Sequence, residues 1–414
     1  MASDSKKKKT SSSSSRSRNS YDMDYERNSS SRSGSGKSSG NRNSSGRPSS
    51  GKKGMSKKQR AKRKRRKMLI FILELFVILI MLLVLWAVIR TEGGIGRVDI
   101  KDEDIVINEE VQENETLQGY RNIALFGVDD RNGKLGKGVR TDTIMVASIN
   151  MDTGDIKLCS VYRDTYLNRG NDTYNKCNGA YANGGPEQAI NMLNMNMDLD
   201  ITDYVTIGFA GMKSVIDALG GVEINVTEDE IVHLNNYMYS MVKEDPVVGL
   251  AGLSYTEVTH AGTQTLDGLQ ALAYCRIRYT KGDDFRRAER QRTVLLAIMD
   301  KAKQASAKDL TAVANSVFDE KMISTSLDIS EILSLLGDVG KYKVVANDGF
   351  PQADMRTTGS IGKKGSCVIP KDLTDNVKWL HEFLFDDPNY TPSDAVQKYS
   401  RQIESDTSPY VGTK

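Results

Sequence analysis

The chain has 414 residues, of which 57 are Lys or Arg, 54 are Asp or Glu and only three are His. No histidine stands in a His-Glu-x-x-His pattern or near a Gly-x-Ser-x-Gly pattern, and the sequence has neither a Walker A loop nor a dinucleotide fingerprint. These absences disfavour zinc peptidases, serine hydrolases, P-loop enzymes and dinucleotide-dependent enzymes. The net charge is +3, but the charges are distributed unevenly along the sequence, because residues 1–67 carry 22 Lys and Arg against 4 Asp and Glu.

Residues 68–89 form the most apolar stretch of the chain, with Glu74 as their only charged residue. As a helix rising about 1.5 Å per residue, this stretch spans a hydrocarbon core about 30 Å thick. It is too long for a signal peptide and no small-residue cleavage site follows it, which indicates an uncleaved anchor. Because the basic block 57–67 precedes it, the positive-inside rule predicts a single-pass protein of the cell membrane with a cytoplasmic N-terminus. The domain that follows is then extracellular.

The basic tail 1–67 is rich in Ser, Gly, Asn, Lys and Arg, so it is predicted to be disordered because it cannot bury enough apolar area. A basic block also permits nucleic-acid binding, but beside a membrane helix we favour a topological role with contact to anionic lipid. No specific nucleic-acid partner is expected. The predicted organisation is a cytoplasmic tail at 1–67, a membrane helix at 68–89, a linker at 90–118, a domain core at 119–306, the C-terminal part of that domain at 307–390 and a C-terminal tail at 391–414.

Beyond the linker, short aliphatic runs bounded by polar turns alternate with helical patterns. Strands are predicted at 122–128, 143–149, 156–161, 204–209 and 222–226. Helices are predicted at 186–195, 212–219, 267–274, 286–305 and about 330–341, with an extended piece at 276–278 and residues 368–385 closing the domain. This alternation predicts the α/β class, as an α/β/α sandwich around a mixed central sheet.

Four cysteines, Cys159, Cys177, Cys275 and Cys367, all follow the predicted membrane helix. An even number in an oxidising compartment permits two disulfides in any of three pairings. The alternative is that two or more of them are buried free thiols.

Two aspartates flank the turn between the first two predicted strands. Asp129 directly follows the first strand, and Asp142 directly precedes the second. Ligands bind at strand ends in open α/β sheets, and paired carboxylates there suit a hard cation such as Mg²⁺ that also takes phosphate oxygens. An Asx-type turn with a surface ion pair is the alternative explanation for these two residues.

Arginines also gather at predicted strand and helix ends. Arg163 and Asp164 follow the third strand, and Arg276 and Arg278 should share one face if their segment is extended. Two like charges side by side are unfavourable without an anion between them. Arginine binds phosphate through its planar fork, so the pattern predicts a pyrophosphate site, although any one cluster alone would fit a solvated salt bridge.

A fourth cluster opens the long helix predicted at 286–305. Its residues Asp284, Arg287 and Gln291 have spacings of three and four, which place them on one helical face. Together with the other clusters, this face favours a site for pyrophosphate and Mg²⁺.

At these residues the chain resembles the LytR–CpsA–Psr family of bacterial cell-envelope proteins. The resemblance covers about residues 120–305, where the family's motifs occur in order behind one predicted membrane helix. They are Gly127-Val-Asp129, Arg140-Thr-Asp142, Arg163-Asp164, Lys176-Cys-Asn178-Gly-Ala-Tyr181, residues 215–222, Leu266-Asp-Gly-Leu-Gln-Ala-Leu-Ala-Tyr274-Cys-Arg276-Ile-Arg278 and Asp284-x-x-Arg287-x-x-x-Gln291. The chain departs from the pattern at Tyr162, where Pro is usual, and at Thr141, which replaces a common Ser.

The resemblance implies an α/β/α domain with a hydrophobic pocket for a polyprenyl chain. It implies a phosphotransferase that moves an anionic glycopolymer from undecaprenyl pyrophosphate to peptidoglycan, with Asp129 and Asp142 at Mg²⁺ (or Mn²⁺) and the pyrophosphate. Arginines would cradle the phosphates while Asp284 and Gln291 orient them, so the catalytic set it implies is Arg163, Arg276, Arg278, Asp284, Arg287 and Gln291. The substrate-binding residues it implies are Arg140, Asp164 and Lys176.

We therefore expect an envelope enzyme of a Gram-positive-type bacterium whose partners are a polyprenyl pyrophosphate-linked glycan, peptidoglycan and membrane lipid. Teichoic acid and capsule both fit as the glycopolymer. One alternative is a lipid-pyrophosphate hydrolase that uses the same arginines with water as the acceptor. The other is a membrane-anchored regulator or scaffold without catalytic activity.

Overall fold

The computed structural model describes residues 100–129, 135–244, 250–278, 283–319 and 322–412. The chain divides into two compact units, residues 1–74 and 75–414, and every described residue belongs to the second. The predicted basic tail and the membrane helix predicted at 68–89 therefore lie outside the described residues. Among the residues that are described, no helix is both long and apolar enough to cross a membrane.

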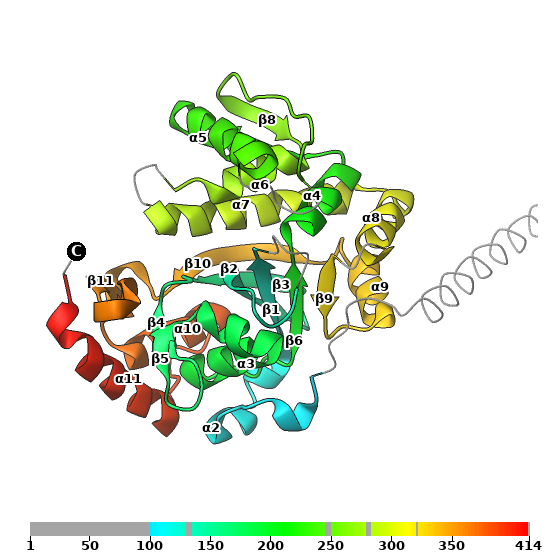
Figure 1. The fold of residues 1–414 in the computed structure, drawn as a ribbon. Coiled ribbons are helices and arrows are strands. Elements are labelled where there is room, and N and C mark those ends of the chain that lie inside the picture. Colours follow the sequence, from blue (N-terminus) through cyan, green and yellow to red (C-terminus); the bar gives the residue numbers. More distant parts are fainter. Residues whose placement is uncertain (1–99, 130–134, 245–249, 279–282, 320–321, 413–414) are drawn as a thin grey trace, which may run out of the picture. The chain divides into compact units, whose positions relative to one another are not determined.

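A six-stranded mixed sheet forms the centre of the domain (Figure 1). Its strands stand in the order β10 (Lys343–Phe350), β3 (Asp155–Val161), β2 (Thr141–Asn150), β1 (Tyr120–Val128), β6 (Asp203–Ile207) and β9 (Ile323–Thr325). Strand β2 pairs antiparallel with β1 and β3, whereas β6 and β10 pair parallel with β1 and β3. The strands predicted at 122–128, 143–149 and 156–161 are confirmed as three neighbours in this sheet.

Helices cover both faces of the sheet, which makes the fold an α/β/α sandwich. On one face, buried side chains of α3 (Gly179–Met197), α10 (Leu373–Phe385) and α11 (Asp394–Thr407) join the main hydrophobic core. On the other face, α7 (Asp283–Gln304) lays Leu295 and Met299 against the sheet. The strands are apolar on both sides because both sides are covered.

A second hydrophobic core forms an upper layer that packs on Val294 of α7. Its elements are α4 (Phe209–Ala218), the hairpin of β7 (Val222–Val226) and β8 (Gly262–Leu266), α5 (Glu228–Tyr239), a π-helical turn (Ser240–Glu244) and α6 (Gly268–Arg276). Figure 1 shows α5 and β8 of this layer above α7. Reciprocal caps fix the starts of two of these helices, Thr227 with Glu230 for α5 and Asp267 with Gln270 for α6.

Smaller elements complete the domain. They are α2 (Glu109–Gln112), the hairpin of β4 (Tyr166–Asn168) and β5 (Tyr174–Lys176), α8 (Ala307–Asp319), α9 (Ile329–Gly337) and the hairpin of β11 (Arg356–Ser360) and β12 (Ser366–Pro370). Short 3₁₀ turns lie at Asp102–Asp104, Leu117–Gly119, Ala353–Met355, Gly362–Lys364 and Ser408–Tyr410.

The predicted bounds differ from the structure at several helix ends. The helix predicted from Pro186 lies within α3, where Gly185 breaks the helical backbone with φ 74° just before that proline. The strand predicted at 204–209 ends earlier, since Gly208 is the N-cap of α4. The helix predicted at 330–341 ends at Gly337.

Two segments that the sequence placed outside the domain core pack into it. Val111 and Leu117, from the predicted linker 90–118, are buried in the main core. In the predicted tail 391–414, α11 buries Val396 and Ile403 in the same core. Both segments are amphipathic with only a few apolar side chains, so their burial depends on the surface that the rest of the fold offers.

The four cysteines form no disulfide and all are free, so of the two alternatives the one with free thiols is confirmed. Cys159, Cys177 and Cys367 are buried, and Cys275 is partly buried. Burial raises the pKa of the Cys275 thiol to about 12, so this sulfur is neutral at physiological pH and unreactive.

Candidate functional site: an arginine–aspartate cluster beside an apolar cavity

A β-bulge between β1 and β2 positions Asp142. Gly127 pairs with Thr143 and Val128 pairs with Thr141, so Asp142 has no partner across the ladder. A bulge turns a side chain out of the regular alternation, and bulges are common beside active sites. Gly127 permits this close pairing, since a Cβ there would come within 2.9 Å of the Thr143 side chain.

The turn after β3 positions Arg163 and Asp164. Thr165 donates from both its backbone N and its hydroxyl to the Tyr162 carbonyl, at 2.9 and 2.6 Å. The Cys177 thiol donates to the carbonyls of Tyr162 and Arg163, at 3.2 and 3.3 Å. The backbone that carries Arg163 is therefore held on both sides.

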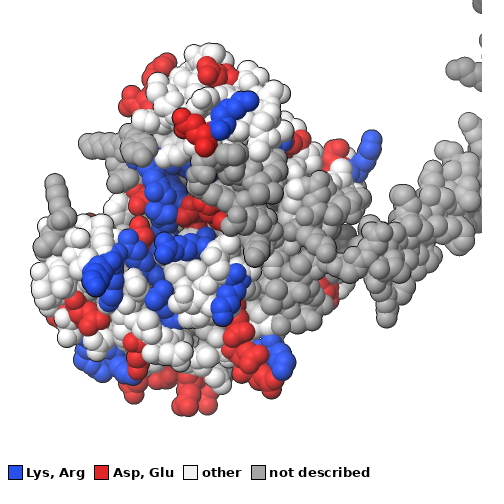
Figure 2. All heavy atoms as spheres, viewed as in Figure 1, with Lys and Arg blue, Asp and Glu red and all other residues white. Residues whose placement is uncertain are grey.

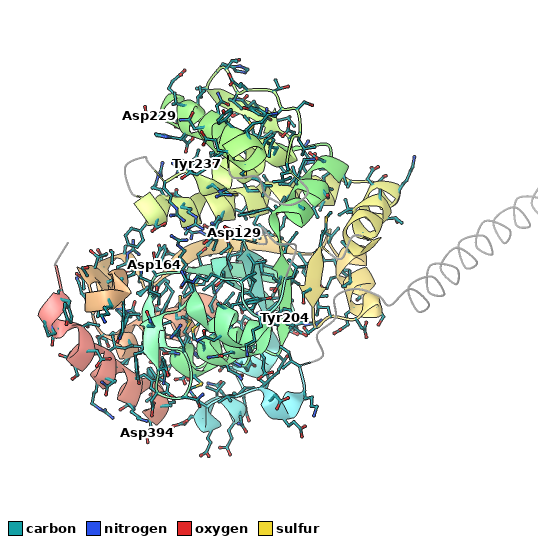
Figure 3. All side chains as sticks on the ribbon, viewed as in Figure 1. Asp129, Asp164, Tyr204, Asp229, Tyr237 and Asp394 are labelled. Atoms are coloured by element: carbon teal, nitrogen blue, oxygen red, sulfur yellow. The ribbon has the colours of Figure 1, made fainter. Side chains whose placement is uncertain are left out.

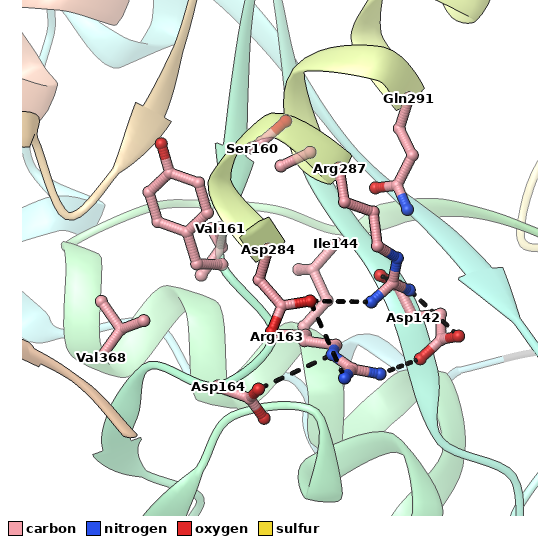
Figure 4. A pocket seen from close by; sticks show the side chains of 12 residues that line it. Asp142, Ile144, Ser160, Val161, Arg163, Asp164, Asp284, Arg287, Gln291 and Val368 are labelled. Carbon is pink, nitrogen blue, oxygen red and sulfur yellow. Dashed lines mark hydrogen bonds and ion pairs between the residues drawn. The ribbon is translucent and has the colours of Figure 1, made fainter. Parts of the chain in front are cut away.

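The side chains at these two places meet in a network of ion pairs (Figure 4). Arg163 donates to Asp142 Oδ1 at 2.6 Å and lies 3.7 Å from an Asp164 oxygen. Arg287 lies 3.0 Å from Asp142 Oδ2 and donates to the Asp142 carbonyl at 3.0 Å. Asp142 thus joins two arginines from distant parts of the sequence.

The start of α7 supplies the opposite wall of this network. Asp284, Arg287 and Gln291 all line the cavity drawn in Figure 4, so they share one helical face as their spacing predicts. Asp284 lies 3.5 Å from Arg287 and 3.9 Å from Arg163. Arg287 is only 3% exposed, so its charge depends on these carboxylates for compensation.

The electrostatics of Asp142 follow from its two arginines. Burial raises the pKa of its carboxyl, but the Arg287 and Arg163 guanidinium groups lower it more, and the pKa lies below the ordinary value. Asp142 is therefore an anion at any physiological pH. Burial lowers the pKa of Arg287, and the Asp142 charge opposes that shift, so the two groups remain a charged pair.

The prediction that Arg276 and Arg278 lie side by side in an extended segment is wrong. The helix α6 continues through Arg276, whose guanidinium lies 4.9 Å from the Phe209 ring and 5.7 Å from the Tyr237 ring. Arg278, beyond the end of the helix, instead reaches Asp284 at 3.6 Å. Arg278 joins the network through this ion pair.

A neighbouring arginine of α7 has a structural role. Arg290 pairs with Glu230 of α5 at 2.8 Å, and both side chains are 4% exposed. It also donates to the Ile277 carbonyl at 3.1 Å. This buried pair fixes the backbone next to Arg278 and ties the upper layer to α7.

An apolar cavity of about 290 Å³ lies between the sheet and the upper layer. Its wall comes from β1, β2, β6, α4, α6 and α7, and includes Leu125, Val205, Leu272 and Ile298. The cavity shares Asp142 and Arg287 with the ion-pair network, and Gln291 and Arg276 also line it. An apolar chamber therefore opens directly onto the cluster of charges.

A polar groove of about 450 Å³ lies on another side of the same cluster. Arg140 and Lys176, both predicted to contact substrate, line it together with Asp164. Lys176 Nζ lies 3.3 Å from Asp164 Oδ1. Three further cations, Arg169, Lys363 and Lys364, also line the groove, and none of them belongs to a motif that could have been recognised in the sequence. Lys363 and Lys364 lie in the turn of a hairpin that only the tertiary fold brings to this groove.

Asp129 directly follows β1, and Figure 3 shows it at the edge of the sheet near α7. Its neighbour Val128 pairs with Thr141, so Asp129 and Asp142 stand at adjacent strand ends. Among the described residues, no group of three or more His, Cys, Asp or Glu side chains is placed to hold a metal ion by itself.

The sequence matches the model of the LytR_cpsA_psr family over residues 96–370. The chain belongs to the LytR–CpsA–Psr family. Curated relatives include a polyisoprenyl-teichoic acid–peptidoglycan teichoic acid transferase, TagU, of Enterococcus faecalis, 31% identical over 51% of this chain and 64% of its own length. TagV of Bacillus subtilis is 28% identical over 65% of each chain. A probable cell wall biosynthesis protein, LcpB, of Corynebacterium glutamicum is 32% identical over 56% of this chain and 50% of its own. The chain thus matches between half and two thirds of the length of these relatives.

Solved structures of this family share the fold. TagT bound to LI-WTA superposes with a TM-score of 0.54 at 21% identity, covering 71% of this chain and all of that one. A crystal structure of B. subtilis TagT gives a TM-score of 0.52 at 22% identity, over 69% of this chain and 99% of that one.

Proposed function

We propose that this protein is a membrane-anchored phosphotransferase that moves an anionic glycopolymer from an undecaprenyl pyrophosphate carrier to peptidoglycan. The observation that carries the proposal is the apolar cavity that shares Asp142 and Arg287 with the ion-pair network. A polyprenyl pyrophosphate has the matching chemistry, a long apolar chain joined to two phosphates. The relatives support this proposal, since TagU and TagV are named as teichoic acid transferases and one TagT structure holds octaprenyl pyrophosphate lipid.

The arginines keep donors available for phosphate. Arg163 Nε is buried and lies 3.7 Å from Asp164 Oδ2, too far for a hydrogen bond, and it makes no other hydrogen bond among the described residues. A buried donor left unpaired costs about 1–3 kcal/mol, which an oxygen of the pyrophosphate would recover. Each guanidinium has five N–H donors, so Arg163, Arg278 and Arg287 have more donors than their carboxylate contacts use. We assign these three arginines to the pyrophosphate.

The transfer step is a displacement at the glycan-linked phosphorus. A sugar hydroxyl of peptidoglycan attacks that phosphorus, the bond from it to the bridging oxygen breaks, and undecaprenyl phosphate leaves. Negative charge grows on the phosphoryl oxygens, and fixed guanidinium groups stabilise it without reorganisation. The lowered pKa of Asp142 makes it a weak base, so we assign the hydroxyl proton to Asp164, which has looser contacts.

Arg276 and Gln291 complete the set of residues that we propose to contact the lipid-linked substrate. Both line the apolar cavity, and Arg276 stacks on aromatic rings there. We propose that they contact the substrate where its polyprenyl chain joins the pyrophosphate, and that Arg140 and Lys176 contact it on the glycan side.

The cofactor in this proposal is Mg²⁺ (or Mn²⁺) at Asp129 and Asp142. Two carboxylates at adjacent strand ends fit an ion that binds one or two protein ligands and takes its remaining oxygens from substrate phosphates and water. When bound, the ion supplies positive charge to the phosphate oxygens. Asp142 would share its oxygens between this ion and the arginines.

The membrane anchor is also part of the proposal. A helix at 68–89 with a cytoplasmic N-terminus would hold the described domain outside the cell, at the leaflet where a lipid-linked glycan is accessible. The named relatives act in cell-wall synthesis, which supports this placement.

The decisive experiment uses the full-length protein in detergent micelles with a synthetic lipid-linked glycan, with and without peptidoglycan. A covalent glycan–peptidoglycan product is expected from the wild type, and at least about 100-fold less from Arg278→Ala. Arg286→Ala is the matched control, because Arg286 faces solvent and pairs with Glu289. Release of free glycan phosphate with or without peptidoglycan would instead indicate a hydrolase. Absence of any turnover, with intact lipid binding, would favour a regulator or scaffold.

A further inference from the structure

The polar groove beside the cluster carries an excess of positive charge. Among the described residues that line it, six are cations and two are carboxylates. The cations are Arg140, Arg163, Arg169, Lys176, Lys363 and Lys364, and the carboxylates are Asp142 and Asp164. Both carboxylates already pair with Arg163, and Asp164 also pairs with Lys176. Figure 2 shows Lys and Arg gathered across the middle of this face.

Among these cations, Arg169 gives the clearest indication of an anion-binding site. Its guanidinium packs against the backbone of Gly179, where a Cβ would come too close to it. Burial and the positive charge of Arg140 both lower its pKa. Its Nε is buried without a hydrogen-bond partner among the described residues. Two arginines that line one groove, one of them with a buried donor that makes no hydrogen bond among the described residues, suit an anion from outside the protein.

The hairpin of β11 and β12 brings two more cations to the same groove. Val368 of β12 donates to the Asp164 carbonyl at 2.9 Å, which ties the hairpin to the Arg163–Asp164 turn. Lys364 donates to the Tyr166 hydroxyl at 2.6 Å and lies 4.6 Å from that ring. The adjacent Lys363 is exposed. The groove therefore has fixed cations on both of its sides.

The groove and the apolar cavity leave the cluster by different routes. Asp142 lines both. The other groove residues are Arg140 before β2, Arg163 and Asp164 in the turn after β3, residues between 169 and 179, and the two lysines of the β11–β12 turn, whereas the rest of the cavity wall comes from β1, β2, β6, α4, α6 and α7. If a pyrophosphate lies at the cluster with its lipid in the cavity, the glycan attached to its other phosphate leaves along the groove.

Resting on the proposed function, we propose that this groove binds a phosphodiester group in the glycan of the donor substrate, through Arg140, Arg169 and Lys363. The site would thereby select donors whose glycan already carries phosphate over donors with a neutral glycan. A phosphodiester suits these cations because it is an anion at any physiological pH and its two unesterified oxygens can each accept from a different cation that lines the groove.

The donor is favoured over peptidoglycan as the occupant because its glycan is covalently joined to the phosphate at the cluster. Its path out of the site is thus confined to the adjoining groove. An acceptor strand has no such constraint.

The test compares two synthetic donors with the same polyprenyl pyrophosphate and disaccharide, one of which carries an added glycerol phosphate on the glycan. Binding to the full-length protein in micelles is measured by calorimetry, and transfer to peptidoglycan is measured separately. The wild type should bind the phosphorylated donor about tenfold more tightly at low salt, and the preference should shrink as salt rises. Arg169→Gln and Lys363→Gln should each reduce the preference several-fold, and the double variant should abolish it.

Lys378→Gln is the control, because Lys378 is also exposed but pairs with Asp375 on α10, away from the groove. Lys363→Gln changes an exposed side chain, so it keeps the test valid if Arg169→Gln fails to fold. Equal weakening of both donors by the groove variants would overturn the proposal, because the groove would then serve the pyrophosphate itself. Loss of affinity for soluble peptidoglycan fragments with the donor preference intact would also overturn it, since the groove would then hold the acceptor. If the wild type keeps the donor preference but forms no glycan–peptidoglycan product, the proposed function fails while the groove assignment stands.

Discussion

Replacing Arg287 by lysine separates the charge of this residue from its geometry. The guanidinium contacts the Asp142 carboxylate at 3.0 Å, the Asp142 carbonyl at 3.0 Å and Asp284 at 3.5 Å, and it is nearly fully buried. A lysine has the charge but only one nitrogen, so it can keep one of these contacts at good geometry. Asp142 stays paired, since Arg163 holds its other oxygen at 2.6 Å.

The magnitudes follow from the contacts that are lost. Two charge-assisted contacts are worth about 1.5–3 kcal/mol each before lysine recovers part, so Arg287→Lys should cost about 2–3 kcal/mol of folding stability. Arg287→Ala should cost about 3–5 kcal/mol, because it removes one cation from a buried ion-pair network, together with all of the packing of the buried side chain. Loss of the fork should lower kcat/KM for glycan transfer about 100-fold in Arg287→Lys, which corresponds to about 2.7 kcal/mol of transition-state stabilisation.

Stability is measured by urea denaturation and activity by initial rates of glycan–peptidoglycan product formation. Arg286→Lys is the control, as the neighbouring arginine on the solvent face of the same helix. Wild-type kcat/KM in Arg287→Lys would refute the assignment of a phosphate-binding fork to Arg287. A loss of activity that merely tracks the unfolded fraction would refute it as well.

Three further predictions concern groups outside this pair. Burial lowers the pKa of His381 to about 4, so the neutral imidazole contributes its full stabilisation only above the ordinary pKa of 6.5, and the free energy of unfolding should fall by about 3 kcal/mol as the pH drops from 6.5 to 4. Denaturation curves of the wild type and of His381→Phe at several pH values check this. An equal slope of unfolding free energy against pH in both proteins would contradict it. Ile298→Trp, which fills the apolar cavity, should raise KM about five- to tenfold for a 55-carbon donor and much less for a short-chain donor, and equal effects on both would exclude a role of the cavity in chain binding. Since all four cysteines are free, a reducing agent should leave the melting temperature unchanged, and a drop of several degrees would show that disulfides form.

The elements near the site could be predicted because their signals are local. The three adjacent strands are aliphatic runs with polar ends, and the face of α7 with Asp284 and Arg287 follows from helical spacing alone. The error at Arg276 has a local cause too, because the reciprocal cap of α6 starts a helix whose nine residues include that arginine.

The remaining parts of the fold and of the candidate site could not be predicted, because they depend on contacts between segments that are distant in the sequence. Strand β10 alternates exposed and partly buried residues over most of its length, so it has no apolar run, yet it completes the sheet edge beside β3. Arg169 and Lys363 lie almost 200 residues apart in sequence, and neither is part of a motif. Their shared groove results from the docking of the β11–β12 hairpin on the Asp164 turn.

The fold thus contains two kinds of cation, and they should respond differently to ionic strength. Arg163 and Arg287 are held by carboxylates, which compensates their charge where water is scarce and lets the cluster exist in a stable domain. Arg169 and Lys363 line a groove open to solvent, where added salt screens their attraction for an anion. A buried pair is screened much less than an exposed charge. Rising salt should therefore weaken recognition of the glycan phosphate before it weakens the hold on the pyrophosphate, so selectivity between donors should disappear at a salt concentration where transfer still proceeds.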